Sequence, residues 1–163
     1  MKYYTKFDAG FCEIYLVGDE NGISCLHWDC EGCKRKFKVE SEWIRNDEFF
    51  SEAIKQLREY FAGKRKVFKL KLNFEGTDFQ KKVWNELRKI PYGELRSYKD
   101  IAEAVGNPKG CRAVGMANSK NPIPFIIPCH RVIGANGKLT GFAHGIGNKE
   151  KLINMERKHN GQG

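Results

Sequence analysis

The sequence predicts a protein of the α/β (α+β) class, with a small antiparallel sheet and one helix followed by a mostly helical part that contains a helix-turn-helix. Three observations predict this class. The first 28 residues are β-rich runs around an Asn-Gly turn, and a single amphipathic helix pattern comes next. From Thr77 onward, apolar residues recur at helical spacing between short turns. The change at Glu75-Gly76 divides the chain into candidate domains 1–74 and 75–163.

The N-terminal strands are expected in the runs YYTKF, CEIYLVG and ISCLHW. Asn21-Gly22 between the second and third runs is a hairpin signal, because both residues tolerate positive φ. A helix is predicted within NDEFFSEAIKQLREYFAGK, with Asp47 as its cap and Gly63 as its stop. The alternation of apolar and basic residues in KVFKLKLNF predicts one more strand.

The C-terminal helices carry clear start signals. Thr77 with Gln80 forms the order of a capping box before one apolar face, and Ser97 with Asp100 repeats that order at the next helix. A short NPK turn leads to the helix GCRAVGMANSKN, which Pro122 breaks. Helix, short turn and helix make a helix-turn-helix, yet packed helix pairs are common, so a DNA-binding and a purely structural interpretation both stay open.

The net charge of +9 is unevenly distributed. Lysine and arginine number 14 against 12 acidic residues in 1–74, and 15 against 8 in 75–163. This excess favours a nucleic acid as partner, with plain solubility as the competing interpretation. Because there is neither a membrane-length apolar run nor a secretory signal, we expect a cytoplasmic protein with no membrane partner.

The cysteines are expected to be free thiols, since an intracellular chain keeps them reduced. Three cysteines and one histidine lie within the run CLHWDCEGC: Cys25, His27, Cys30 and Cys33. Cys-x-x-Cys is a zinc spacing, but the second such pair that a complete site requires is missing. We therefore expect no metal, with an N-terminal zinc as the alternative.

The stretch NPIPFIIPCHRV places three prolines within seven residues, directly before Cys129. Prolines at this density exclude a helix or a central strand, and the apolar residues between them predict a buried, irregular path. Such a path would hold Cys129 at a fixed place. A buried free cysteine is more often only a small apolar residue, but the adjacent His130 and Arg131 favour a thiolate and hence a nucleophile.

Five short motifs between residues 76 and 156 go beyond general chemistry: IPYGE, SY, RAVG, NPIP and PCHRV. In this order and spacing they closely resemble the C-terminal domain of the O6-alkylguanine-DNA alkyltransferases, or methylated-DNA–protein-cysteine methyltransferases. Residues 1–74 resemble the family's N-terminal domain in length and element order. The resemblance implies a structural α/β domain followed by a winged-helix-like domain that binds DNA and accepts the alkyl group.

Proteins of that family repair DNA by moving an alkyl group from guanine O6 to their own cysteine, irreversibly, once per molecule and without a cofactor. By resemblance Cys129 is the acceptor. His130 would take the thiol proton through a water, and Glu156 would orient His130. Tyr98 would donate to guanine N3 as the leaving purine gains electron density.

The implied partner is double-stranded DNA with an O6-alkylguanine, bound by a monomer through the minor groove. The alkylated base must be flipped out to reach a buried thiol, and Arg112 would fill the gap. Small residues on the same helix would allow the close approach: Ala113, Gly115 and Ala117. Tyr98 would contact the flipped nucleotide.

The resemblance also implies a pocket for the flipped base, walled by Asn121, Pro124 and the strip Gly141–Phe142–Ala143. Many members have tyrosine and serine where Phe142 and Ala143 stand, and usually glycine where His144 stands. The bulk of His144 predicts a narrower pocket that disfavours benzyl-type guanine inhibitors.

Three other functions compete with alkyl transfer. A helix-turn-helix regulator would have no use for Pro-Cys-His-Arg. Alkyltransferase-like recognition modules bind the same lesion without repairing it, but they commonly carry tryptophan in place of the cysteine. A cysteine hydrolase would use Cys, His and an acid, although neighbouring side chains seldom face each other, and it would turn over repeatedly.

Overall fold

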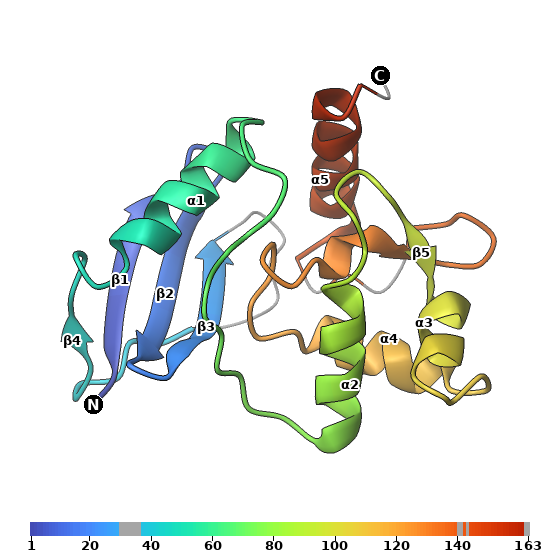
Figure 1. Ribbon diagram of the computed structural model, residues 1–163, viewed down its shortest axis with the longest axis horizontal. Coiled ribbons are helices and arrows are strands. Elements are labelled where there is room, and N and C mark those ends of the chain that lie inside the picture. Colours follow the sequence, from blue (N-terminus) through green and yellow to red (C-terminus); the bar gives the residue numbers. More distant parts are fainter. Residues whose placement is uncertain (30–36, 140–141, 143, 162–163) are drawn as a thin grey trace. The chain divides into compact units, whose positions relative to one another are not determined.

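The computed structural model describes residues 1–29, 37–139, 142 and 144–161 (Figure 1). The chain separates into two compact units, Met1–Glu75 and Gly76–Gly163. Helices and short strands occur together, which confirms the predicted fold class. Among the described residues, no helix has both the length and the apolarity needed to cross a membrane.

The first unit contains a four-stranded sheet with the order β3-β2-β1-β4. Its strands are β1 (Tyr3–Asp8), β2 (Glu13–Asp19), β3 (Gly22–Asp29) and β4 (Ile44–Arg45). The first three pair antiparallel, while β4 runs parallel to β1. Asp19 pairs with Gly22, so the β2–β3 hairpin turns at Glu20 and Asn21 and the hairpin prediction is confirmed.

Helix α1 (Ser51–Phe61) crosses the sheet in Figure 1 and buries Leu57 and Tyr60. The predicted helix is therefore present, but Asp47 does not cap it. The Asp47 carboxylate instead accepts a hydrogen bond from Thr5 Oγ1 on β1 at 2.7 Å. This bond ties the segment before the helix to the sheet.

The strand predicted in KVFKLKLNF is wrong. Only one isolated bridge forms there, between Leu72 and Ile23. The buried Gln56 of α1 takes the place of a neighbouring strand: its amide accepts from Lys69 N at 2.9 Å and donates to Lys69 O at 3.2 Å. A helix side chain satisfies the backbone groups that a strand would have offered to the sheet.

The second unit is mostly helical, as predicted. Its elements are α2 (Asp78–Leu87), β5 (Arg96–Ser97), α3 (Tyr98–Ala104), α4 (Cys111–Ser119), the 3₁₀ turn η1 (Cys129–Arg131), β6 (Val132–Ile133) and α5 (Ile146–His159). Both predicted capping boxes are present, at Thr77 with Gln80 and at Ser97 with Asp100. Helices α3 and α4 and the short link between them form the expected helix-turn-helix.

Two contacts hold the helices of this unit close to η1. Strands β5 and β6 pair in parallel, which brings the start of α3 beside the segment after η1. The indole of Trp84 on α2 donates to the Ala117 carbonyl on α4 at 2.8 Å. Helices α2, α3 and α4 therefore form one packed block next to η1.

Candidate active site

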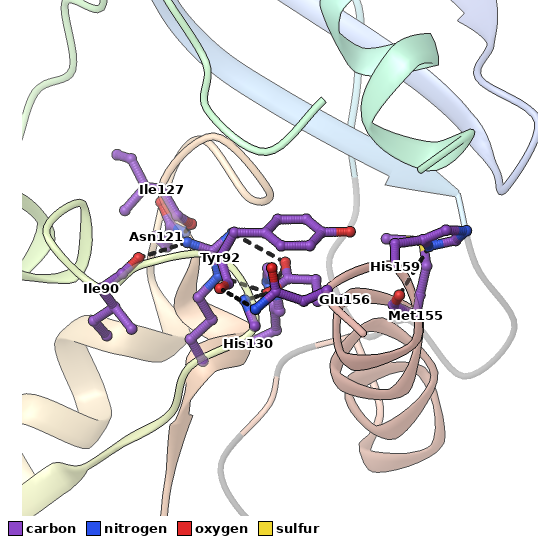
Figure 2. Close-up of polar contacts among 11 residues, drawn as sticks. Ile90, Tyr92, Asn121, Ile127, His130, Met155, Glu156 and His159 are labelled. Carbon is purple, nitrogen blue, oxygen red and sulfur yellow. Dashed lines mark hydrogen bonds and ion pairs between the residues drawn. The ribbon is translucent and has the colours of Figure 1, made fainter. Parts of the chain in front are cut away.

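The proline-rich path before Cys129 is held by backbone clamps from asparagine side chains. Asn121 donates to the Ile127 carbonyl at 2.7 Å and accepts from Ile123 N at 3.0 Å (Figure 2). Phe125, between these ends, has φ of 70°, a left-handed conformation that is uncommon for a residue with a side chain. Such strain persists only where the surroundings hold it, which fits a functional segment.

Asn118, near the end of α4, donates to the carbonyl of Cys129 at 3.2 Å. The tie between the second helix of the helix-turn-helix and Cys129 is thus made by Asn118. Asn121, predicted as part of the pocket wall, is buried and hydrogen-bonded to the loop backbone. Pro124 is buried in the same loop.

Cys129 is buried, 3% exposed, at the start of the turn η1. Its own N–H donates to the Ile127 carbonyl at 2.8 Å, and Arg131 N donates to the Pro128 carbonyl at 3.0 Å. The backbone around the thiol is therefore hydrogen-bonded on both sides. A fixed sulfur is what nucleophilic attack along one line requires.

His130 and Glu156 contact each other in the interior, as the family resemblance implies. His130 Nε2 lies 2.5 Å from Glu156 Oε2, and both side chains are about fully buried (Figure 2). Arg131 joins them: its Nε and Nη2 donate to the two oxygens of Glu156 at 2.8 and 3.1 Å. Gly93 N adds a further bond to Glu156 Oε1 at 3.2 Å.

The charges of this cluster follow from its contacts. Burial lowers the pKa of His130 and outweighs the opposing effect of Glu156. Burial acts to raise the pKa of Glu156, but His130 and Arg131 more than offset it and leave that pKa well below its usual range. At neutral pH the cluster contains ionised Glu156, charged Arg131 and a neutral His130.

Lys149 was not among the predicted site residues, yet it is fully buried. Its Nζ lies 3.4 Å from Tyr98 Oη and over the rings of Tyr98 and Phe142, at 5.6 and 5.7 Å from their centroids. Burial lowers the pKa of Lys149 to about 8, while Cys129 acts in the opposite direction. A cation near a thiol favours the thiolate.

The sequence did contain a signal for Lys149. Four residues of α5 are buried, at positions i, i+3, i+4 and i+7: Lys149, Leu152, Ile153 and Glu156. This is the spacing of one helix face. A lysine and a glutamate at the ends of an apolar stripe indicate charged groups that face the interior.

On α4 the exposed residues include Arg112 and Ala113, and Gly115 is half-buried. A Cβ added at Gly115 would lie 4.0 Å from Tyr98 Cε1, so this helix surface adjoins Tyr98. Ala117 was expected on the same surface, but it is 2% exposed and this expectation is wrong. With Val114 it lies on the face of α4 that packs into the core.

The remaining wall of the predicted pocket is partly described. Phe142 contacts the buried His144, with ring centroids 5.4 Å apart. Gly141 and Ala143 lie outside the described residues. The His144 carbonyl accepts from Asn148 Nδ2 at 2.8 Å, which fixes His144 to the start of α5.

The N-terminal metal alternative involves residues that are only partly described. Within 1–29, 37–139, 142 and 144–161, no cluster of three or more His, Cys, Asp or Glu residues could hold a metal ion. His27 lies 3.1 Å from Asp29 and stacks on Phe37. Cys30 and Cys33 lie outside the described residues.

Fold and site together define a class: a protein with a buried cysteine, followed by a buried histidine paired with a glutamate, in the same unit as a helix-turn-helix. Two family models match the chain, described as the ribonuclease-like domain and the DNA binding domain of 6-O-methylguanine DNA methyltransferase. They cover residues 2–74 and 78–158. The chain belongs to the 6-O-methylguanine DNA methyltransferase family, and residues 78–158 are its DNA-binding domain.

Similar proteins carry the matching enzyme name. The methylated-DNA–protein-cysteine methyltransferase of Methanosarcina acetivorans is 54% identical over 94% of this chain and 97% of its own length. The constitutive enzyme of Bacillus subtilis is 46% identical over 96% of each chain. The resemblance noted from the sequence motifs is therefore confirmed, and the chain is an enzyme of this family.

Solved structures agree. The O6-methylguanine methyltransferase of Mycobacterium tuberculosis superimposes with a TM-score of 0.87 at 41% identity, covering 98% of this chain and 94% of that one. The same organism's OGT in complex with DNA gives a TM-score of 0.86 at 41% identity, over 96% and 94%. DNA repair by alkyl transfer is the activity of the family to which this fold belongs.

Proposed function

We propose that the protein repairs double-stranded DNA by moving the alkyl group of an O6-alkylguanine to Sγ of its own Cys129. A bond forms between Sγ and the alkyl carbon, the bond from that carbon to O6 breaks, and the electron pair stays on the purine. The product is a thioether, so each molecule acts once. The thiolate itself is the nucleophile, and the step uses no metal or cofactor.

The observation that carries this proposal is that His130, which directly follows the buried Cys129 in the chain, is itself buried and paired with Glu156. An ionised carboxylate only accepts hydrogen bonds, so His130 Nε2 carries the proton toward Glu156. The neutral ring then has its lone pair on Nδ1. That atom takes the proton of Cys129 through a water, and Glu156 stabilises the imidazolium that results.

Tyr98 and Lys149 stabilise the leaving purine. Tyr98 donates a hydrogen bond to N3 as negative charge develops on the base. Lys149, 3.4 Å from the Tyr98 hydroxyl, makes that hydroxyl a better donor and favours the Cys129 thiolate. Both effects stabilise charge that appears only as the alkyl group moves.

Binding to the lesion uses residues 75–163, while residues 1–74 form a structural domain, and we propose that the protein acts as a monomer. Helix α4 enters the minor groove with its exposed small residue Ala113 and the half-buried Gly115. The alkylated base is flipped out of the duplex, and the exposed Arg112 fills the gap. Removing the guanidinium should weaken binding to every duplex and slow transfer from paired lesions.

His144 and Phe142 set the size limit of the pocket. Since His144 is buried against Phe142, a benzyl substituent would have to displace packed rings. We expect methylated DNA to inactivate the protein far more readily than free O6-benzylguanine does. Equal sensitivity to both would exclude this role of His144.

The proposed function is tested by intact mass after incubation with duplex DNA that contains one O6-methylguanine. We expect one methyl increment, saturating at one per protein and located on the Cys129 peptide. A Cys129→Ala variant should gain none, while Cys111→Ala, which removes an exposed thiol, should behave as wild type. Tight binding without a mass gain would instead identify a lesion-recognition module. Product formation that continues past one equivalent per protein would identify a hydrolase.

A further inference from the structure

Arg131 has no role in the relay described so far, although it is 6% exposed and stands directly after His130. Its Nε and Nη2 pair with both oxygens of Glu156 at 2.8 and 3.1 Å. Its third nitrogen, Nη1, donates to the Ile90 carbonyl at 2.6 Å. A planar fork with all three nitrogens engaged has one orientation, and that orientation fixes the carboxylate.

The turn after α2 holds the other side of this ion pair. The guanidinium lies over the Tyr92 ring at 5.7 Å, and Gly93 N donates to Glu156 Oε1 at 3.2 Å. Gly93 has φ of +79°, and a Cβ there would lie 2.6 Å from Asn160 Nδ2. Figure 2 shows Tyr92 beside Glu156 and His130. The turn therefore contacts both members of the pair and leaves little room for either to move.

The charged and titratable groups that act on this cluster are His130, Arg131, Glu156, Tyr92 and, beyond His130, Lys149. Glu156 is the anion among them, and Arg131 is its closest permanent cation. If Arg131 were neutral, the buried carboxylate would need another counter-charge. The nearest source is a proton held on His130, 2.5 Å away.

We infer that Arg131 is a positioning residue of the relay: its charge keeps Glu156 ionised without a proton from His130, so His130 stays neutral and free to accept the proton of Cys129. The inference rests on the proposed function, because it assigns Arg131 a part in proton transfer from that thiol. It predicts that the charge of residue 131, and not only its shape, decides the pH range of alkyl transfer.

The test compares Arg131→Gln, Arg131→Lys and Arg157→Gln in the full chain. Arg157 is an exposed cation one residue after Glu156 and serves as the control. Nitrogen NMR of the His130 ring, assigned with a His130→Gln variant, reports its protonation without DNA. Single-turnover transfer from methylated DNA then gives the pH profile.

In the wild type and in Arg157→Gln we expect a neutral His130 with its proton on Nε2 at neutral pH. In Arg131→Gln the ring should be protonated there, and the acidic limb of the transfer profile should move up by at least about one pH unit. That shift slows transfer about tenfold below the new midpoint, with recovery above it. Arg131→Lys should keep the wild-type midpoint, with a slower plateau.

An unchanged His130 and an unchanged profile in Arg131→Gln would overturn the inference and leave Arg131 a structural residue. If that variant does not fold, the comparison moves to Arg131→Met, which keeps much of the side chain's length without its charge. His130 should again be protonated at neutral pH in that variant, and a neutral ring would equally overturn the inference. Absence of transfer in the wild type, with His130 titrating as expected, would reject the proposed function alone.

Discussion

Two buried charged residues of opposite sign lie on the same face of α5, and the protein surrounds them in opposite ways. Glu156 receives hydrogen bonds from Arg131, His130 and Gly93 N. Lys149, seven residues earlier, contacts the hydroxyl and ring of Tyr98 and the face of Phe142. The anion is neutralised by a permanent cation, whereas the cation is placed against polarisable rings and a titratable hydroxyl.

In the proposed mechanism these two arrangements serve two tasks. A fixed carboxylate, neutralised by Arg131, leaves His130 neutral and able to accept a proton, and a cation with a lowered pKa favours negative charge at the thiol and the leaving base. Seven residues of helix span about 10 Å along the helix axis. Helix α5 thus separates the proton-accepting and charge-stabilising ends of the site.

The largest expected effect comes from breaking the neutralised end. Glu156→Gln leaves the Arg131 guanidinium buried without its counter-charge, and such a loss costs about 3–5 kcal/mol of unfolding free energy. Transfer should slow at least about 100-fold, because His130 loses the group that orients and stabilises it. Urea unfolding and single-turnover kinetics measure both. Glu150→Gln, on the exposed face of α5, should change neither.

Removing the charge of Lys149 should change the unfolding free energy in the opposite direction. Lys149→Met removes a charge that burial disfavours, so stability at neutral pH should stay equal or rise by up to about 3 kcal/mol. Transfer should nevertheless slow about tenfold, since the Tyr98 hydroxyl and the thiolate lose a nearby positive charge. A strongly destabilised Lys149→Met protein would show that the two ends do not differ as described.

The same lysine predicts a pH dependence of stability. Its pKa is about 8 in the folded protein and near 10.5 unfolded, so above pH 8 the unfolded state binds more protons. Wild-type stability should therefore rise relative to Lys149→Met as the pH increases from about 8 to 10.5. Urea titrations of both proteins at several pH values in this range measure the difference. If the two unfolding free energies changed with pH in the same way, the lowered pKa would be contradicted.

A smaller effect is expected at Asn121, which holds the proline-rich path before Cys129. Asn121→Ala removes two buried backbone bonds at Ile123 and Ile127, at a cost of about 1–3 kcal/mol. Transfer should slow because the thiol is less well held, but the pH profile should keep its midpoint. Asn85→Ala, at an exposed position of α2, is the matched control. A shifted midpoint would mean that the clamp also affects the charges.

The smallest effect on stability and activity is expected on α4, the helix that we propose contacts DNA. A methyl at Gly115 has space, with Tyr98 Cε1 at 4.0 Å, so Gly115→Ala should raise stability by up to about 1 kcal/mol. DNA binding should weaken, because α4 can no longer approach the duplex as closely. Gly147→Ala on α5, where nothing lies within 4 Å, should leave binding unchanged. Fluorescence anisotropy with labelled duplex distinguishes the two.

Local chemistry made much of the fold and part of the site predictable. Thr77 with Gln80 specifies a helix start on its own, and Asn21-Gly22 specifies a hairpin. Cys129 and His130 are neighbours in the chain, so proposing both for one site needed no knowledge of the fold. Glu156 lies 26 residues further on, and the family motifs identified it.

The remainder depended on tertiary partners that local patterns do not contain. Gln56 satisfies the backbone of Lys69, so an alternating sequence forms no strand. Ala117 is small in any position, and only the packing of α4 shows that it faces the core. Arg131 was expected to favour the Cys129 thiolate, and its pairing with Glu156 depends on where the chain places α5.

The bond from Asn118 to the Cys129 carbonyl joins the helix that we propose meets DNA to the residue that we propose reacts. Enzymes that cycle commonly open a lid to release product, and that motion often limits their rate. A protein that keeps its product for good has no such step. The helix that binds DNA and the cysteine that reacts can therefore belong to one rigid unit. The rate of repair then depends on how quickly the protein finds the lesion.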